Sequence, residues 1–267
     1  VGWNVKAPSY RFDINEECDL IEEISRVYGF ENIPERIEHQ NMALKTKSPR
    51  QIKRERIDSI FHRLGYNEVV NYSFVSPSMN SLLNSNQDMI DLQNPISIEM
   101  SVMRNSLWPG LLNNLSHNIK RQHKNIKIFE IGKLFASKKK KPVEKNVIAG
   151  LIYGQRRLES WAYQKNSLDF YDLKGHLEDL FNSFELKNIT FVSTSHPILC
   201  PGVAADIKLK NKKIGIIGML NPELAADIKL DHDAFIFEID YSSLELPDLR
   251  SFVSSEYYPY SRRDLSL

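Results

Sequence analysis

Hydrophobic positions recur along the chain at two spacings. In four stretches they lie three to four residues apart, which predicts helices around residues 20–28, 49–64, 107–119 and 173–184. Elsewhere apolar and polar residues alternate, which predicts strands at 68–75, 126–137, 146–154, 189–193, 204–209, 213–218 and 235–241. Polar residues dominate between 77 and 94, where we expect a loop or a short helix.

The predicted helix at 107–119 leads into the strand that begins at Ile126. Ser106 stands in a plausible capping position for this helix, and Pro109 falls in its first turn. In the strand, Ile128 and Glu130 share one face, and we expect a central strand that is buried on at least one side. Two interpretations of Glu130 are open: an ordinary carboxylate near a strand end, or a group that binds a ligand.

Four carboxylates gather around the start of the first predicted helix. Asp19, Glu22 and Glu23 are spaced to project from one side of that helix, and Asp13 precedes them in an extended segment. Such a cluster is repulsive unless a cation offsets it. The spacing alone favours a simpler interpretation, in which Asp13 caps the helix and the others are solvated acids that interact with the helix dipole.

Two basic segments are candidates for contact with RNA. The outer face of the helix at 49–64 carries Arg50, Lys53, Arg54 and Arg56. The turn between the strands at 126–137 and 146–154 carries Lys138–Lys141. Lysine and arginine clusters gain affinity for phosphates by releasing counterions, but most such clusters are simply solvated.

Composition excludes several classes of protein. A net charge of +1 over 267 residues argues against a uniformly basic nucleic-acid binder. Cys18 and Cys200 lack metal or disulfide spacing, so we expect a reducing, cytoplasmic environment. The longest apolar run, 147–153, is far shorter than the roughly 20 residues of a membrane helix, so no membrane contact is expected. Because the chain starts at Val1 and lacks a signal peptide, we expect an excised fragment.

Several strings of residues resemble the β subunit of bacterial phenylalanyl-tRNA synthetases. One is the helix motif Arg-x-Ser-Leu-x-x-Gly-Leu-Leu at 104–112, which leads to Phe-Glu-Ile-Gly at 129–132. The amino-terminal part carries Pro-Ser-x-Arg-x-Asp at 8–13, Asp-Leu-x-Glu-Glu-x-x-Arg-x-Tyr-Gly at 19–29 and Asn-Ile-Pro at 32–34. A further match is Asp-Phe-Tyr-Asp-Leu-Lys-Gly at 169–175. The resemblance covers essentially the whole chain.

The resemblance implies an α+β fold of the class II aminoacyl-tRNA synthetase type. This is an antiparallel sheet flanked by helices, preceded by part of a small winged-helix-like domain. It implies three segments: 1–40 from the small domain, 41–250 as the catalytic-like core, and 251–267 as a linker and the start of an anticodon-binding-like domain. It also implies that Asp13, Asp19, Glu22 and Glu23 are ligands of a magnesium ion, and carboxylate oxygens suit that ion.

The resemblance further implies a subunit without catalytic or cofactor-binding residues of its own. An active motif 2 strand carries an arginine at the position held here by Ile128, and no motif 3 arginine appears in the chain. The α subunit would use ATP to attach phenylalanine to tRNA(Phe), while this chain scaffolds it in an α2β2 complex. Cys200 and Val203 replace a histidine and an arginine of the family pattern, so no role is transferred to them.

Two other functions compete with the scaffold. The first is an autonomous RNA-binding adaptor built on an inactive synthetase-like fold, for which the two basic segments would be the evidence. The second is a free-standing enzyme that activates an amino acid. Neither a Walker loop nor a Gly-x-Ser-x-Gly elbow occurs in the chain, and no serine or lysine has a base that the sequence identifies.

Overall fold

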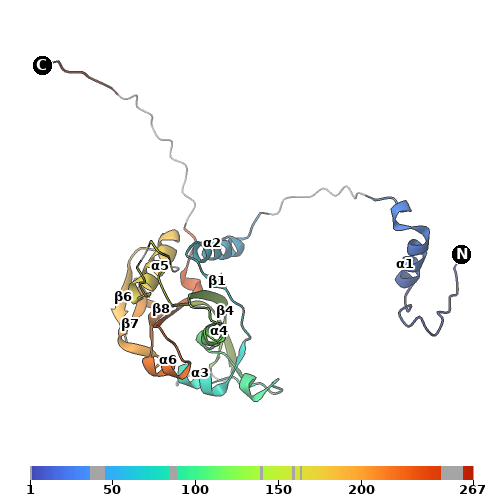
Figure 1. Cartoon of the computed structure of the whole chain (residues 1–267), viewed down its shortest axis with the longest axis horizontal. Coiled ribbons are helices and arrows are strands. Elements are labelled where there is room, and N and C mark those ends of the chain that lie inside the picture. The colour runs from blue at the N-terminus through green and yellow to red at the C-terminus, as the bar shows by residue number, and fades with distance from the viewer. Residues whose placement is uncertain are drawn as a thin grey trace. The chain divides into compact units, whose positions relative to one another are not determined.

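The computed structural model describes residues 2–36, 46–83, 89–138, 141–157, 160–162, 164–247 and 261–266. The chain forms two compact units, Val1–Thr46 and Lys47–Leu267 (Figure 1). The predicted boundary at residue 40 and most of the predicted terminal segment 251–267 lie outside the described residues, so both remain predictions. Among the described residues, no helix is long and apolar enough to cross a membrane.

The amino-terminal unit contains the first predicted helix. Helix α1 spans Glu17–Tyr28 and is followed by the short 3-10 helix η1, Phe30–Asn32. Gly29 ends α1 with a φ of 95°, a conformation that glycine adopts without strain. The predicted apolar face of α1 is present, but none of its residues is buried, and Val27 is 80% exposed.

A seven-stranded sheet with the order β1-β4-β5-β9-β8-β7-β6 organises the larger unit. Its strands are β1 Asn67–Glu68, β4 Ile126–Lys138, β5 Lys141–Tyr153, β6 Ile189–Ser193, β7 Leu199–Leu209, β8 Lys212–Leu220 and β9 Ala234–Asp240. Within this sheet β1 and β4 run parallel, and the other neighbours are antiparallel. The prediction that β4 is central was wrong: it is second from an edge, and β9 holds the middle position.

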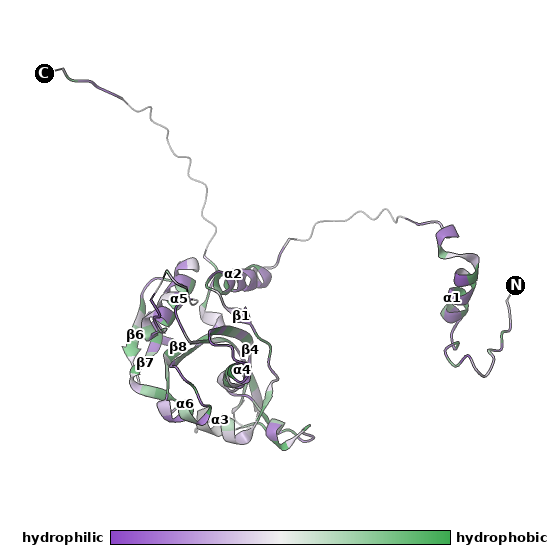
Figure 2. Cartoon of the chain, viewed as in Figure 1, coloured by the Kyte–Doolittle hydropathy of each residue, from purple (hydrophilic) through white to green (hydrophobic). Residues whose placement is uncertain are grey.

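Helices cover both faces of this sheet. Helices α2, Pro49–Arg63, and α5, Phe170–Ser183, pack on the face that carries Phe129, and α4, Trp108–Ile119, packs on the face that carries Ile128 (Figure 1). The alternation read from the sequence of β4 is therefore confirmed. Figure 2 shows α2 largely in the colour of hydrophilic residues, as expected for a helix with one narrow buried side.

The predicted strand at 68–75 was wrong in its middle. Strand β1 ends at Glu68, and β2, Phe74–Val75, belongs to a second sheet in which it pairs with β3, Val102–Met103. Between them Val70 and Tyr72 are exposed, whereas Val69 is partly buried and donates its backbone N–H to the carbonyl of Phe129 at 2.9 Å. The remaining short elements are α3 Pro77–Leu83, η2 Ile98–Met100, α6 Pro222–Asp227 and η3 Tyr241–Ser243.

Strands β4 and β5 form the predicted hairpin. They pair along their whole length, whereas β9 pairs with β5 over Val147–Tyr153. The half of the hairpin nearer its turn therefore extends beyond the end of β9. Lys139 and Lys140 of the predicted basic turn lie outside the described residues.

Candidate functional site

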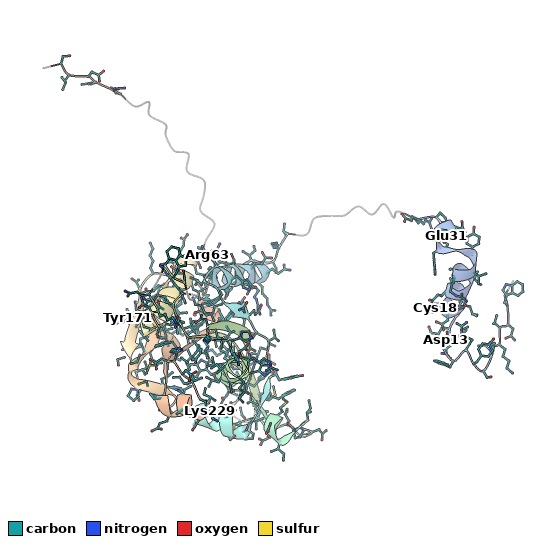
Figure 3. All side chains as sticks on the ribbon, viewed as in Figure 1. Asp13, Cys18, Glu31, Arg63, Tyr171 and Lys229 are labelled. Atoms are coloured by element: carbon teal, nitrogen blue, oxygen red, sulfur yellow. The ribbon has the colours of Figure 1, made fainter. Side chains whose placement is uncertain are left out.

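The structure joins two of the four predicted metal ligands through an arginine. Asp13 lies in the segment before α1 (Figure 3), and its carboxylate accepts hydrogen bonds from Nε and Nη2 of Arg11 at 3.0 and 2.7 Å. The same Nη2 donates to Glu23 at 2.6 Å. Hydrogen bonds from Arg11 lower the pKa of Asp13, and those from Arg11 and Arg26 lower the pKa of Glu23 to about 2.

The other two predicted ligands have different surroundings. Asp19 accepts hydrogen bonds from the backbone N–H groups of Asn15 and Glu16, both at 2.8 Å, which lower its pKa and complete the capping of α1. Glu22 is exposed on α1. The interpretation in which Asp13 caps the helix was therefore wrong, because Glu16 is the N-cap and Asp19 forms the capping box with it.

These carboxylates do not fit a metal ion in the arrangement described. Their oxygens have the right chemistry for a hard cation. Within the described part of the chain, however, no three histidine, cysteine, aspartate or glutamate side chains are grouped closely enough to hold one. A guanidinium stands between Asp13 and Glu23 where an ion would have to bind both.

On the sheet, the position that an active motif 2 would give to arginine is part of the core. Ile128 is 5% exposed and belongs to the cluster formed with Leu107, Leu111 and Leu115 at α4. The side chains of α4 thus fill the space above this part of β4. A phosphate-binding group is absent at Ile128, and a bulky ligand would have to displace the helix to reach it.

Glu130 is a buried structural carboxylate. It receives a hydrogen bond from Arg104 at 2.6 Å and another from Asn71 at 2.7 Å. Arg104 also donates from Nε to the carbonyl of Lys133 at 3.0 Å, so its guanidinium lies across β4. Gly132 is required beneath it, because a Cβ there would lie 2.3 Å from Arg104 Nη2. Both charges of the pair are satisfied within the chain.

A second carboxylate on the same face holds the start of α4. In the cross-strand register Glu130 faces Ala149, and Ala149 faces Glu238 on β9. Glu238 accepts hydrogen bonds from the hydroxyl of Ser106 at 2.8 Å and the backbone N–H of Leu107 at 3.0 Å. Burial raises the pKa of Glu238. Sequence reasoning missed Arg104 and Glu238 as partners, because each contact joins segments far apart along the chain.

The predicted basic face of α2 is largely engaged within the larger unit. The Lys53 ammonium donates to the carbonyl of Tyr241 at 2.5 Å and lies 3.9 Å from the centre of its ring. Arg54 pairs with Asp58 and Glu68, and Arg56 donates to the carbonyl of Ser183 at 3.0 Å. These contacts weaken the case for α2 as an RNA-binding surface, since Lys53, Arg54 and Arg56 already have partners.

Comparison with solved structures identifies the fold. Two structures of the pyrrolysyl-tRNA synthetase of Desulfitobacterium hafniense superpose with a TM-score of 0.55 and 16% identity, over 73% of this chain and 66% and 67% of theirs. Together with the helix-flanked sheet, this likeness defines a class II aminoacyl-tRNA synthetase fold, and the predicted fold class is confirmed.

Comparison of sequences identifies the family. The family model "Phenylalanyl tRNA synthetase beta chain CLM domain" matches residues 33–241, and the "tRNA synthetase B5 domain" matches residues 1–30. The chain therefore belongs to the phenylalanyl-tRNA synthetase β chain family, as the sequence motifs predicted.

Named relatives agree with this assignment. The phenylalanine–tRNA ligase β subunit of Pseudomonas fluorescens Pf0-1 is 36% identical over 99% of this chain and 34% of its own length. That of Legionella pneumophila Paris is 36% identical over 99% of this chain and 33% of its own length. The chain thus spans about a third of the length of these curated relatives.

Proposed function

We propose that this chain is the part of a phenylalanine–tRNA ligase β subunit that supports a catalytic α subunit in an α2β2 complex. In that complex the α subunit would attach phenylalanine to tRNA(Phe) with ATP, in the cytoplasm. Family membership supports the proposal, as does the packed sheet face over Ile128.

One observation carries the scaffold role: large apolar side chains are exposed in two segments of the larger unit. Val70 is 88% and Tyr72 68% exposed, and Ile96 is 79% and Ile98 86% exposed. Tyr72 and Met100, which lies two residues beyond Ile98, line the same cavity of about 400 Å³ beside α4. Exposed apolar groups gathered in this way are typical of protein–protein interfaces. We call the side chains of Val70, Tyr72, Ile96 and Ile98 the apolar patch.

A binding experiment tests the assignment of the apolar patch. The chain is mixed with separately purified α subunit and the complex is measured by gel filtration. We expect co-elution, and at least a tenfold loss of affinity for Ile98→Asp, because a charge would be buried against an apolar partner. Val192→Asp is the matched control: Val192 is 42% exposed on β6, at the opposite edge of the sheet from β1. Equal binding by both variants would reject the patch, and no co-elution of the unaltered chain would reject the scaffold.

We also propose that magnesium is the ion bound by Asp13, Asp19, Glu22 and Glu23. Support comes from the match to the B5 domain and from the preference of magnesium for carboxylate oxygens with retained waters. Because the described arrangement does not fit an ion, Arg11 would have to release Asp13 and Glu23 before they could serve as ligands.

A further inference from the structure

A cavity of about 450 Å³ lies at the end of the sheet where β4 begins and β5 ends. Its lining comes from segments that are far apart along the chain: the turn after α4 with Lys124, the region after β5 with Lys165, and the turn before β9 with His232. Tyr153, the last residue of β5, connects two of these segments, because its hydroxyl accepts a hydrogen bond from the backbone N–H of Asp231 at 3.2 Å. The cavity is therefore formed by the packing of this end of the sheet.

Positive side chains outnumber negative ones around this cavity. Lys124 and Lys165 line it together with one carboxylate, that of Asp231. Lys120 and Arg121 precede Lys124 in the same turn, and all three are exposed. Among the described residues these three cations form no ion pair, whereas the basic face of α2 has most of its cations engaged. The turn after α4 can therefore attract an anion from outside the chain.

An exposed tryptophan lies in the same loop as Lys165. Trp161 is 100% exposed, and the base of this loop is closed by the bridge between Gln155 and Ser167. Gln155 also lines the cavity. A large aromatic ring usually gains stability by being buried, so a ring left in solvent is available to a partner. Such rings stack on unpaired nucleic-acid bases beside cations that bind the phosphates.

We propose that this cavity and the turn after α4 bind single-stranded RNA, with a phosphate held by Lys124 and Lys165 and a base stacked on Trp161. Lysines gain affinity for phosphates by releasing counterions, and an aromatic ring can stack on any base. The contact therefore tolerates different base sequences and weakens as the salt concentration rises. This inference goes beyond the scaffold role, because the RNA contact requires no α subunit.

Fluorescence anisotropy of a labelled single-stranded oligoribonucleotide, titrated with the full chain at several salt concentrations, tests the proposal. We expect Lys124→Gln to weaken binding about fivefold at about 0.1 M salt and to reduce the slope of log K against log[salt] by about 0.7, the values for one lost phosphate contact to a single strand. Trp161→Leu should weaken binding about tenfold, through the loss of stacking. Asp231→Asn should tighten binding about twofold, because it removes a charge that repels phosphate.

Lys212→Gln is the matched control for the loss of one positive charge. Lys212 begins β8 at the opposite end of the sheet, is exposed, and forms no ion pair within the part of the chain that the structure describes. Its affinity for RNA should equal that of the unaltered chain. Equal losses for Lys212→Gln and Lys124→Gln would show a diffuse attraction and overturn the site. Unchanged binding by Trp161→Leu would refute the stacking.

Two further outcomes would also overturn the proposal. One is binding of inorganic phosphate or AMP without binding of the oligonucleotide, which would indicate a site for small anions. The other is no binding of RNA by the unaltered chain at about 0.05 M salt, where attraction to phosphates is strong. If the same chain still co-elutes with the α subunit, the RNA site is refuted and the scaffold role stands.

Discussion

Glu130 and Arg104 form a buried ion pair on the sheet. Their side chains are 3% and 6% exposed, and each is the other's counter-ion. The sequence left two interpretations of Glu130 open, and neither included a buried pair. The partner lies 26 positions earlier in the chain, a separation at which local spacing carries no information about contact.

Removal of Glu130 should therefore destabilise the larger unit strongly. Glu130→Ala leaves Arg104 buried without a counter-ion, and we expect the free energy of unfolding to fall by about 3–5 kcal/mol. Glu144→Ala breaks the pair with Lys133, in which both side chains are about half exposed, and should cost less than about 1 kcal/mol. Urea denaturation followed by the fluorescence of the buried Trp108 measures both. Similar losses for the two variants would contradict the structural role of the pair.

His176 gives the larger unit a defined sensitivity to acid. Its Nδ1 lies 2.9 Å from the hydroxyl of Tyr66, and burial, with Lys127 nearby, lowers its pKa from 6.5 to about 4. The unfolded chain then binds a proton at higher pH than the folded chain. Stability is therefore lost as the pH falls from about 6.5 toward 4.

The variant His176→Asn isolates this contribution. Asparagine can keep a hydrogen bond to Tyr66 but does not titrate. We expect the free energies of unfolding of the two chains to differ by a constant amount above pH 7, and the difference to shift in favour of the variant as the pH falls below 6.5. Denaturation at a series of pH values measures it. A difference that does not change with pH would show that His176 is protonated equally in both states.

At the scale of elements, one glycine allows the end of β5 to lie close to the start of β4. Gly154 follows β5 with a φ of 101°, and a Cβ there would lie 2.1 Å from the backbone oxygen of Lys124, just before β4. We expect Gly154→Ala to cost at least about 2 kcal/mol, from backbone strain together with the clash.

The control is a glycine inside a helix with open space around it. At Gly175 in α5 a Cβ would meet nothing within 4 Å. Gly175→Ala should therefore stabilise by up to about 1 kcal/mol, since alanine is the better helix former. Thermal denaturation of both variants gives the comparison. A loss of stability for Gly175→Ala as large as that for Gly154→Ala would argue against the close packing described between Gly154 and Lys124.

Local pattern predicted most elements but not their arrangement. The helices α1, α2, α4 and α5 and the strands of the large sheet follow from apolar spacing and caps, such as Ser48 with Gln51 in α2. The order of strands did not follow, because it is fixed by partners that are distant in sequence. The stretch after Glu68 was mistaken for a strand, since Val70 and Tyr72 have the spacing of a strand but are exposed to solvent.

For the whole molecule, sequence motifs were enough to predict the family. The hydrogen-bond partners of the four carboxylates became known only from the structure. The four carboxylates could be named from their spacing and the resemblance, but no local pattern indicated that Arg11 would bind two of them. The affinity of these carboxylates for a cation depends on the positions of their oxygens, which the spacing of the residues along the chain does not determine. Placement of the carboxylates as ion ligands therefore remains a proposal.

Phenylalanine-dependent exchange of pyrophosphate into ATP tests most directly whether this chain activates phenylalanine itself or only supports an α subunit that does so. The assay compares the chain alone, the α subunit alone and their mixture. Because Ile128 is buried under α4 and Glu130 is paired with Arg104, we expect no exchange by the chain alone. In the mixture we expect a higher rate of exchange than with the α subunit alone. Exchange by the chain alone, at a rate that survives repurification and follows its concentration, would contradict the scaffold role.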